Sequence, residues 1–226
     1  MAHGYGTRFK PVENLSKSRW RINICREEVV KIKKELIRKA AIDVIAENGF
    51  FNATVDRIAA RAGVAVGTVY NYFEKKEDIL DYIFQVEYEK RVSFLEDLKK
   101  RDTGPVEKIR EIMNMHFSEM KKNPNLARVL LRERGFAEQD KMIHIKKFEK
   151  LPAQIKDIIQ EGVDKGLIRK CNPEILSVFI FGAVEALMTK FILESKSGGT
   201  SDIFDAALEE MSNLLEKGLV QSPGES

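Results

Sequence analysis

The chain has 226 residues, enough to bury a hydrophobic core and to form one domain with a smaller second one. Hydrophobic residues make up 43% of it and charged residues 32%, with 14 glycines and 6 prolines, which excludes a disordered or collagen-like chain and favours a helix-rich globular protein. The net charge of +3 is uneven, because residues 1–39 hold 11 basic side chains against 4 acidic ones, typical of a surface that attracts a polyanion such as DNA or of a solvated basic face.

The N-terminal residues 1–24 mix Gly, Pro, Ser and Arg without periodicity, which predicts a mobile basic arm. Its basic side chains either follow a neighbouring minor groove of DNA, as other flexible arms do, or remain solvated. Ordered structure is expected to begin near Cys25.

Three short helices are predicted over residues 25–74. The first carries apolar residues at helical spacing and ends at Asn48-Gly49, where glycine supplies a left-handed stop. Thr54 can cap the second helix and Gly63 ends it, and the third helix follows directly. This arrangement of two short helices joined by a small residue predicts a helix-turn-helix.

The remaining residues, 75–220, predict a second domain built only of helices, followed by a frayed tail over 221–226. A long fourth helix runs from Lys75 to about Asp102, and a fifth carries one apolar stripe. Further helices are expected over residues 125–134, 139–165, 173–194 and 201–217, with a bend at Pro152. The predicted fold class is therefore all-α.

The third helix exposes an outer face suited to DNA. If Val69 points inward, steps of 100° per residue place Phe73 on the same face and Gly67 and Asn71 on the opposite one. Hydroxyl and carboxamide groups on that outer face can contact phosphates and base edges, and Asn71 can pair with an adenine through two hydrogen bonds.

The segments AIDVIAENGF, TVDRIAARAGV and AGVAVGTVYNYFEKKEDIL together resemble the signature of the tetracycline-repressor (TetR) family, over about residues 33–82. The resemblance implies a transcriptional repressor that binds a palindromic operator in double-stranded DNA as a homodimer, and that is released by a small molecule. Carried over position by position, it implies a set of DNA-binding residues, namely Thr54, Val66, Gly67, Thr68, Tyr70, Asn71, Tyr72 and Lys76, the last reaching a phosphate.

The third helix departs from the family pattern at one residue, and two of its tyrosines have an alternative role. Ala65 replaces the usual Ser or Thr at the start of the third helix, which removes a cap worth about 1 kcal/mol. Tyr70 and Tyr72 have the alternative role of covering the core, since tyrosine is often half-buried.

Two C-terminal helices are expected to form the dimer, unless their apolar faces close one chain's own core. Small residues on the first allow close approach of backbones, and the second carries a long apolar stripe. The expected contact residues are Phe179, Gly182, Ala183 and Ala186 on the first, and Ile203, Phe204, Ala207, Leu208, Met211, Leu214 and Leu215 on the second.

The segments HFSEMKKNPNLARVLLRE and FIFGAVEALMTKFIL are similar to the FadR-type branch of the family, which senses long-chain acyl-CoA and represses fatty-acid degradation. The branch implies a pocket for a hydrophobic effector, possible ligand contacts being Met113, His116, Phe117, Met120, Phe148, Phe179, Met188 and Arg132. Other basic residues expected at the pocket mouth, where they would meet the CoA phosphates, are Arg128, Arg134 and Lys146. His116 can instead be a core histidine.

Two other classes of function, an efflux repressor and an enzyme, are less consistent with the sequence. Glu185 lies in an apolar helix, where an unpaired carboxylate would favour binding of a cationic drug. A repressor of an efflux system that senses such drugs is therefore the alternative, unless Glu185 is paired or points to solvent. The three histidines form no metal-spaced set and no phosphate loop appears, so an enzyme, a cofactor or a bound metal is not expected. A purely structural helical protein would not explain the polar face around Asn71.

The expected location is the cytoplasm. Cys25 and Cys171 are too few for a disulfide framework, and the N-terminus lacks the apolar core of a signal peptide. The longest apolar run, Val178 to Met188, is too short to cross a bilayer and contains an acid, so no membrane partner is expected.

Overall fold

The computed structural model describes residues 14–135, 143–148, 150–195 and 203–220, with side chains from residue 27 onward except Ser195. Its elements within these ranges are α-helices, which confirms the all-α prediction, and one isolated antiparallel bridge joins Ile168 to Val220. The helices are α1 (Asn14–Asn48), α2 (Val55–Ala62), α3 (Val66–Tyr70), α4 (Lys76–Lys99), α5 (Pro105–Lys122), α6 (Pro124–Glu133), α7 (Ile143–Phe148), α8 (Ala153–Asp164), α9 (Pro173–Ser195) and α10 (Ile203–Leu219).

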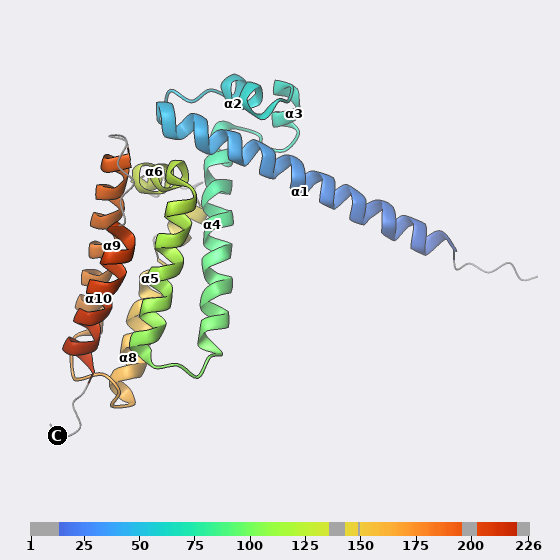
Figure 1. Cartoon of the computed structure of the whole chain (residues 1–226). Coiled ribbons are helices and arrows are strands. Elements are labelled where there is room, and N and C mark those ends of the chain that lie inside the picture. The colour runs from blue at the N-terminus through green and yellow to red at the C-terminus, as the bar shows by residue number, and fades with distance from the viewer. Residues whose placement is uncertain (1–13, 136–142, 149, 196–202, 221–226) are drawn as a thin grey trace, which may run out of the picture.

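Helix α1 begins at Asn14 rather than near Cys25, so the second half of the expected arm is helical backbone. The segment NLSKSRWRINI contains neither Pro nor Gly, and nothing in it therefore breaks a helix. The first part of the arm, residues 1–13, lies outside the described residues. In Figure 1 the N-terminal half of α1 extends well beyond the rest of the molecule.

The local signals of the helix-turn-helix are realised as expected. The Thr54 hydroxyl accepts a hydrogen bond from the Arg57 backbone N–H at 3.3 Å, which caps α2. Gly63 ends that helix with φ of 65°, a left-handed conformation that costs glycine little. Ala65 offers α3 no side-chain cap, as its sequence implied.

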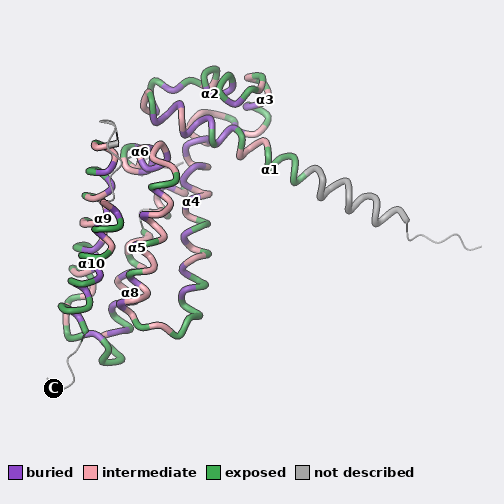
Figure 2. Tube along the Cα trace, viewed as in Figure 1, coloured by how far each residue is buried: buried purple, intermediate pink, exposed green. Residues whose placement is uncertain are grey.

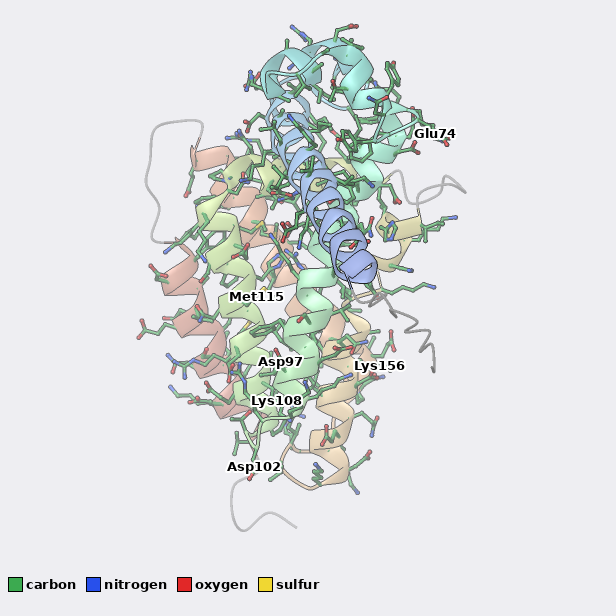
Figure 3. The ribbon with its side chains drawn as sticks, turned by 90° about the vertical axis from the view of Figure 1, so that its right-hand side faces the viewer. Glu74, Asp97, Asp102, Lys108, Met115 and Lys156 are labelled. Atoms are coloured by element: carbon green, nitrogen blue, oxygen red, sulfur yellow. The ribbon has the colours of Figure 1, made fainter. Side chains whose placement is uncertain are left out.

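The larger domain is a bundle in which α4, α5, α8, α9 and α10 run beside one another below the helix-turn-helix (Figure 1). Helix α4 runs from the helix-turn-helix down most of the bundle (Figure 1). In Figure 3 Glu74, just before its start, lies at the helix-turn-helix, whereas Asp97 and Asp102 lie toward the opposite end. One helix is therefore shared by both domains.

The helix expected over residues 139–165 is divided into α7 and α8, and Pro152 stands at the N-cap of α8. Proline cannot donate the hydrogen bond that an uninterrupted helix would need, so the predicted bend is a complete break. The Asp81 carboxylate of α4 accepts the backbone N–H of His144 at 2.9 Å, which satisfies a donor at the start of α7.

Helix α9 has an apolar face that the other helices of the bundle do not cover. Ile175, Val178, Phe179 and Leu193 are more than half exposed, and Gly182 is exposed on the same side of the helix. Figure 2 shows exposed stretches along α9. The longer stretch Pro173–Glu194 would by length and composition alone suffice to cross a membrane, with a mean hydropathy of 1.9, a test that core helices of soluble proteins also pass. It packs against α6, α8 and α10 as a bundle helix.

Candidate functional site

The outer face of α3 has the orientation that its sequence predicted. Val69 and Phe73 are buried, with exposed fractions of 1% and 5%, whereas Gly67 and Asn71 are exposed. Tyr70 is 52% exposed, so covering the core is not its role. This leaves a small polar surface with the carboxamide of Asn71 accessible to base edges.

Other residues expected at DNA are placed differently. Tyr72, Val66 and Thr68 are half-buried, and the first two pack against the core, so only their edges face outward. Thr54 is exposed but its hydroxyl caps α2. The Lys76 ammonium donates to the carbonyl oxygens of Phe50 at 2.8 Å and Phe51 at 3.2 Å, so it holds the α1–α2 loop instead of reaching outward.

A pocket opens inside the bundle, between α4, α5, α6, α8 and α9. The free space between its side chains is about 90 Å³ in this structure, and the whole hollow, including the part open to solvent, is about 870 Å³. Met115, labelled midway along α5 in Figure 3, is one of its lining residues. The lining is mostly apolar and comprises Arg91, Leu95, Ile112, Met113, Met115, His116, Leu130, Leu131, Arg134, Phe148, Leu151, Pro152, Gln154, Ile155, Phe181, Val184, Glu185 and Met188.

Four of the predicted ligand contacts line this pocket, namely Met113, His116, Phe148 and Met188. Phe117 and Met120 do not, although both are buried. The Phe117 ring stacks on Phe204 with ring centroids 4.7 Å apart. Phe179 points to the outside of α9 and is 71% exposed.

Arg132 is also absent from the pocket. Its guanidinium donates to the backbone carbonyl of Ile45 on α1 and, at 2.7 Å, to the Glu133 carboxylate. Arg128 bonds to Asn125 at 2.9 Å and, with Lys146, is not among the lining residues, so Arg134 is the expected mouth residue that the pocket contains.

Sequence reasoning missed the contribution of α4, whose Arg91 and Leu95 form part of the lining. A signal was available, because Glu87 and Arg91 stand at helical spacing within the apolar stripe of Phe84, Leu95 and Leu98. Charges in a buried stripe are uncommon unless they are paired or functional.

The carboxylate of Glu185 is not free to receive a cation. It forms an ion pair with Arg134 across the pocket, one of the hydrogen bonds measuring 3.1 Å. A cationic drug would have to displace this arginine, which contradicts the hypothesis of a cation receptor at Glu185.

His116 contributes a neutral imidazole to the pocket. Burial, together with the positive charge of Arg91, lowers its pKa to about 3. Its Nε2 atom lies 2.8 Å from the Met188 sulfur. Both side chains line the pocket, and the small exposed part of His116 faces that space.

We expect His116→Gln to reduce the acid sensitivity of folding. Unfolded histidine binds a proton below its ordinary pKa of 6.5, whereas folded His116 does not until about pH 3, so the wild type loses stability as pH falls from 6.5. Between pH 7 and pH 5 this amounts to about 2 kcal/mol. Urea unfolding at both pH values measures it, and equal losses in both proteins would contradict this assignment.

A buried chain of ion pairs connects the pocket to the helix-turn-helix. Glu87, fully buried on α4, accepts from Arg91 at 2.8 Å and from Arg38 of α1 at 3.5 Å. Arg38 in turn donates to the Glu35 carboxylate at 2.7 Å and 2.9 Å. Burial opposes ionisation of Glu87, but Arg91 and Lys90 outweigh it and lower its pKa.

Helix α6 makes a second connection. Leu130 and Leu131 line the pocket, while Glu133 accepts the backbone N–H of Phe50 at 3.2 Å. At the other end of the helix Asn125 donates to Asp43 of α1 at 2.8 Å. A shift of α6 would therefore move the α1–α2 loop directly.

Among the described residues, no group of His, Cys, Asp or Glu is arranged to hold a metal ion.

Comparisons with known proteins agree with this geometry. Residues 37–83 match the family described as bacterial regulatory proteins, tetR family, and residues 102–189 match the tetracyclin repressor-like C-terminal domain. The chain is 33% identical to the fatty acid metabolism regulator protein of Bacillus subtilis (strain 168) over 75% of this chain and 89% of that protein.

Two solved structures are similar over most of their length. The transcriptional regulator FadR from Bacillus subtilis in complex with stearoyl-CoA is 30% identical, with a TM-score of 0.66 over 81% of this chain and 98% of that one. The fatty acid degradation regulator FadR from Bacillus halodurans is 28% identical, with a TM-score of 0.69 over 81% of this chain and 94% of that one.

Proposed function

The chain belongs to the TetR family of bacterial regulatory proteins, and on this premise we propose that it is a transcriptional repressor released from its operator by long-chain acyl-CoA. The carrying observation is the apolar pocket, two of whose lining helices, α4 and α6, also bond to α1 or to the α1–α2 loop of the helix-turn-helix. The regulator of Bacillus subtilis with bound stearoyl-CoA supports the ligand class. Regulation of fatty-acid metabolism in the cytoplasm follows, and catalysis is not part of the proposal.

Pairing of two copies is the second part of the proposal. One helix-turn-helix reads only a few base pairs, and a twofold dimer doubles the contacts on a palindromic operator. The exposed apolar face of α9, with Phe179 at its centre, supplies a contact surface. On α10, Phe204, Ala207 and Leu215 are buried within the chain's own core, which leaves Leu214 as an exposed member of that stripe.

The proposed mechanism is a shift between two populations of the dimer. Ligand between α4, α5 and α6 favours an arrangement in which the two recognition helices no longer match the operator. The sequence suggested α4 as the lever, and the ion pair between Glu87 and Arg38 gives it a contact with α1. Helix α6 supplies a parallel route through Glu133 and Phe50.

Fluorescence anisotropy with promoter fragments from the protein's own genomic neighbourhood tests the function. We expect binding that weakens steeply with salt, since lysines and arginines release counterions from DNA, and that is reversed by micromolar stearoyl-CoA. Failure to bind any fragment at low salt would contradict the repressor function. Indifference of the complex to acyl-CoA of every length would contradict the proposed effector.

Asn71→Ala is expected to weaken binding to the specific operator by about 1–3 kcal/mol, because a carboxamide that reads one base pair contributes about that much. The residue is exposed, so the melting temperature and stearoyl-CoA binding should not change. Anisotropy with specific and random duplexes measures the difference. Equal weakening on both duplexes would place Asn71 at the phosphates instead.

A further inference from the structure

Arg91 stands out among the residues that line the pocket. It is 5% exposed, although it is an arginine in an apolar environment. Its Nη1 atom donates to the Glu87 carboxylate at 2.8 Å and to the Glu87 backbone carbonyl at 2.9 Å. Its Nε and Nη2 atoms are buried and have no hydrogen-bond partner among the described residues.

An arginine normally satisfies such donors when it is removed from water, because an unpaired buried donor is costly. The Phe148 ring, also part of the lining, lies 5.1 Å from the guanidinium carbon and can offer only its π face. His116 also lines the pocket, and its neutral imidazole does not neutralise the cation. The guanidinium therefore retains two donors for which the described residues supply no acceptor.

The local charge supports an acceptor oxygen as the missing partner. Glu87 is shared by three cations, namely Arg91, Arg38 and Lys90, and Arg38 has a second carboxylate in Glu35. The carboxylate that pairs with Arg91 among the described residues is thus divided among several groups. A carbonyl or carboxylate oxygen from a ligand would complete the hydrogen bonding of Arg91 in a site of low dielectric.

We propose that Arg91 is the specificity-determining residue of the pocket, donating from Nε and Nη2 to an oxygen carried by the acyl effector. This rests on the proposed function, since it assigns the polar contact of the same ligand. The oxygen belongs either to a thioester carbonyl or to a free carboxylate, which share the chemistry of an acceptor on a long hydrocarbon chain. A hydrocarbon chain alone would leave both donors buried and unpaired.

The test compares three ligands by isothermal titration: stearoyl-CoA, its thioether analogue S-octadecyl-CoA, which lacks the carbonyl oxygen, and stearate. The wild type is compared with the double variant Glu87→Gln, Arg91→Met, which removes both charges and so leaves neither one buried alone. Lys90→Met is the matched control, because Lys90 also pairs with Glu87 but does not line the pocket.

We expect the wild type and Lys90→Met to bind stearoyl-CoA or stearate about 10-fold or more tightly than the thioether, which lacks the acyl oxygen. A hydrogen bond to a charged donor contributes about that much. The double variant should lose that preference while binding the thioether as the wild type does, which shows that the apolar pocket is intact. Dependence on Arg91 for stearoyl-CoA alone identifies the thioester, and dependence for stearate alone identifies the carboxylate.

A preference that persists in the double variant, or a wild type that binds all three ligands equally, would overturn the role of Arg91 while leaving the proposed function standing. If the wild type binds none of the three, the proposed function itself fails. A double variant that loses the thioether as well points to a collapsed pocket, and would count against a specific contact with oxygen.

Discussion

Phe179→Glu is expected to convert the protein to a monomer and to weaken operator binding by at least about 100-fold. The side chain is 71% exposed at the centre of the apolar face of α9, so a charge there would have to be buried in the proposed dimer. Loss of the second half-site removes the effective concentration that links the two binding events. Light scattering measures the mass, and anisotropy measures the affinity for the operator.

The matched control is Ile143→Glu, which places the same charge on another exposed apolar residue, 55% exposed on α7. It should leave both the mass and the affinity unchanged. A dimer that persists in Phe179→Glu would show that the pairing surface lies elsewhere. A monomer that still binds the operator as the wild type does would contradict the need for two half-sites.

Glu87→Leu is expected to lower the free energy of unfolding by about 3–5 kcal/mol, because it leaves the buried guanidinium of Arg91 without its carboxylate. Arg38 is affected less, since it keeps Glu35. Denaturant unfolding at pH 7 measures the loss. Addition of Arg91→Met should restore part of the stability, because the unpaired charge is then removed.

The same pair gives a pH signature. The pKa of Glu87 is lowered in the folded state, so its contribution is present above its ordinary value of 4.5 and is lost as pH falls below it. Wild type and Glu87→Leu should therefore approach one another in stability below about pH 4. A constant difference down to pH 3 would mean that the cost arises from packing and not from charge.

The helix-turn-helix was readable from the sequence because its signals act over short distances. Thr54 caps a helix that begins at the next residue, and Gly63 ends it by its own backbone conformation. Val69 and Phe73 lie one turn apart, so one inward residue fixes the orientation of the other. The predicted start of α1, near Cys25, was wrong, because it rested on the mixed composition of residues 1–24. Residues 14–24 contain no helix-breaking Pro or Gly, and the helix begins at Asn14.

The pocket could be located only in part. Met113 and Phe117 belong to one stripe of α5, yet Met113 lines the pocket and Phe117 stacks against α10. An apolar stripe is wide enough to face several neighbouring helices, and the sequence does not show between which of them a space remains. The prediction therefore identified the helix but not the residues.

Charge pairing was likewise decided by distant parts of the chain. Arg132 and Arg134 are two positions apart, which is about 200° on a helix, and one bonds to Ile45 of α1 while the other pairs with Glu185 of α9. Composition and periodicity determined the fold class, the recognition helix and the apolar helices by themselves. Only packing between helices decided which polar groups met, because hydrogen bonds act over a few ångströms between residues far apart in sequence.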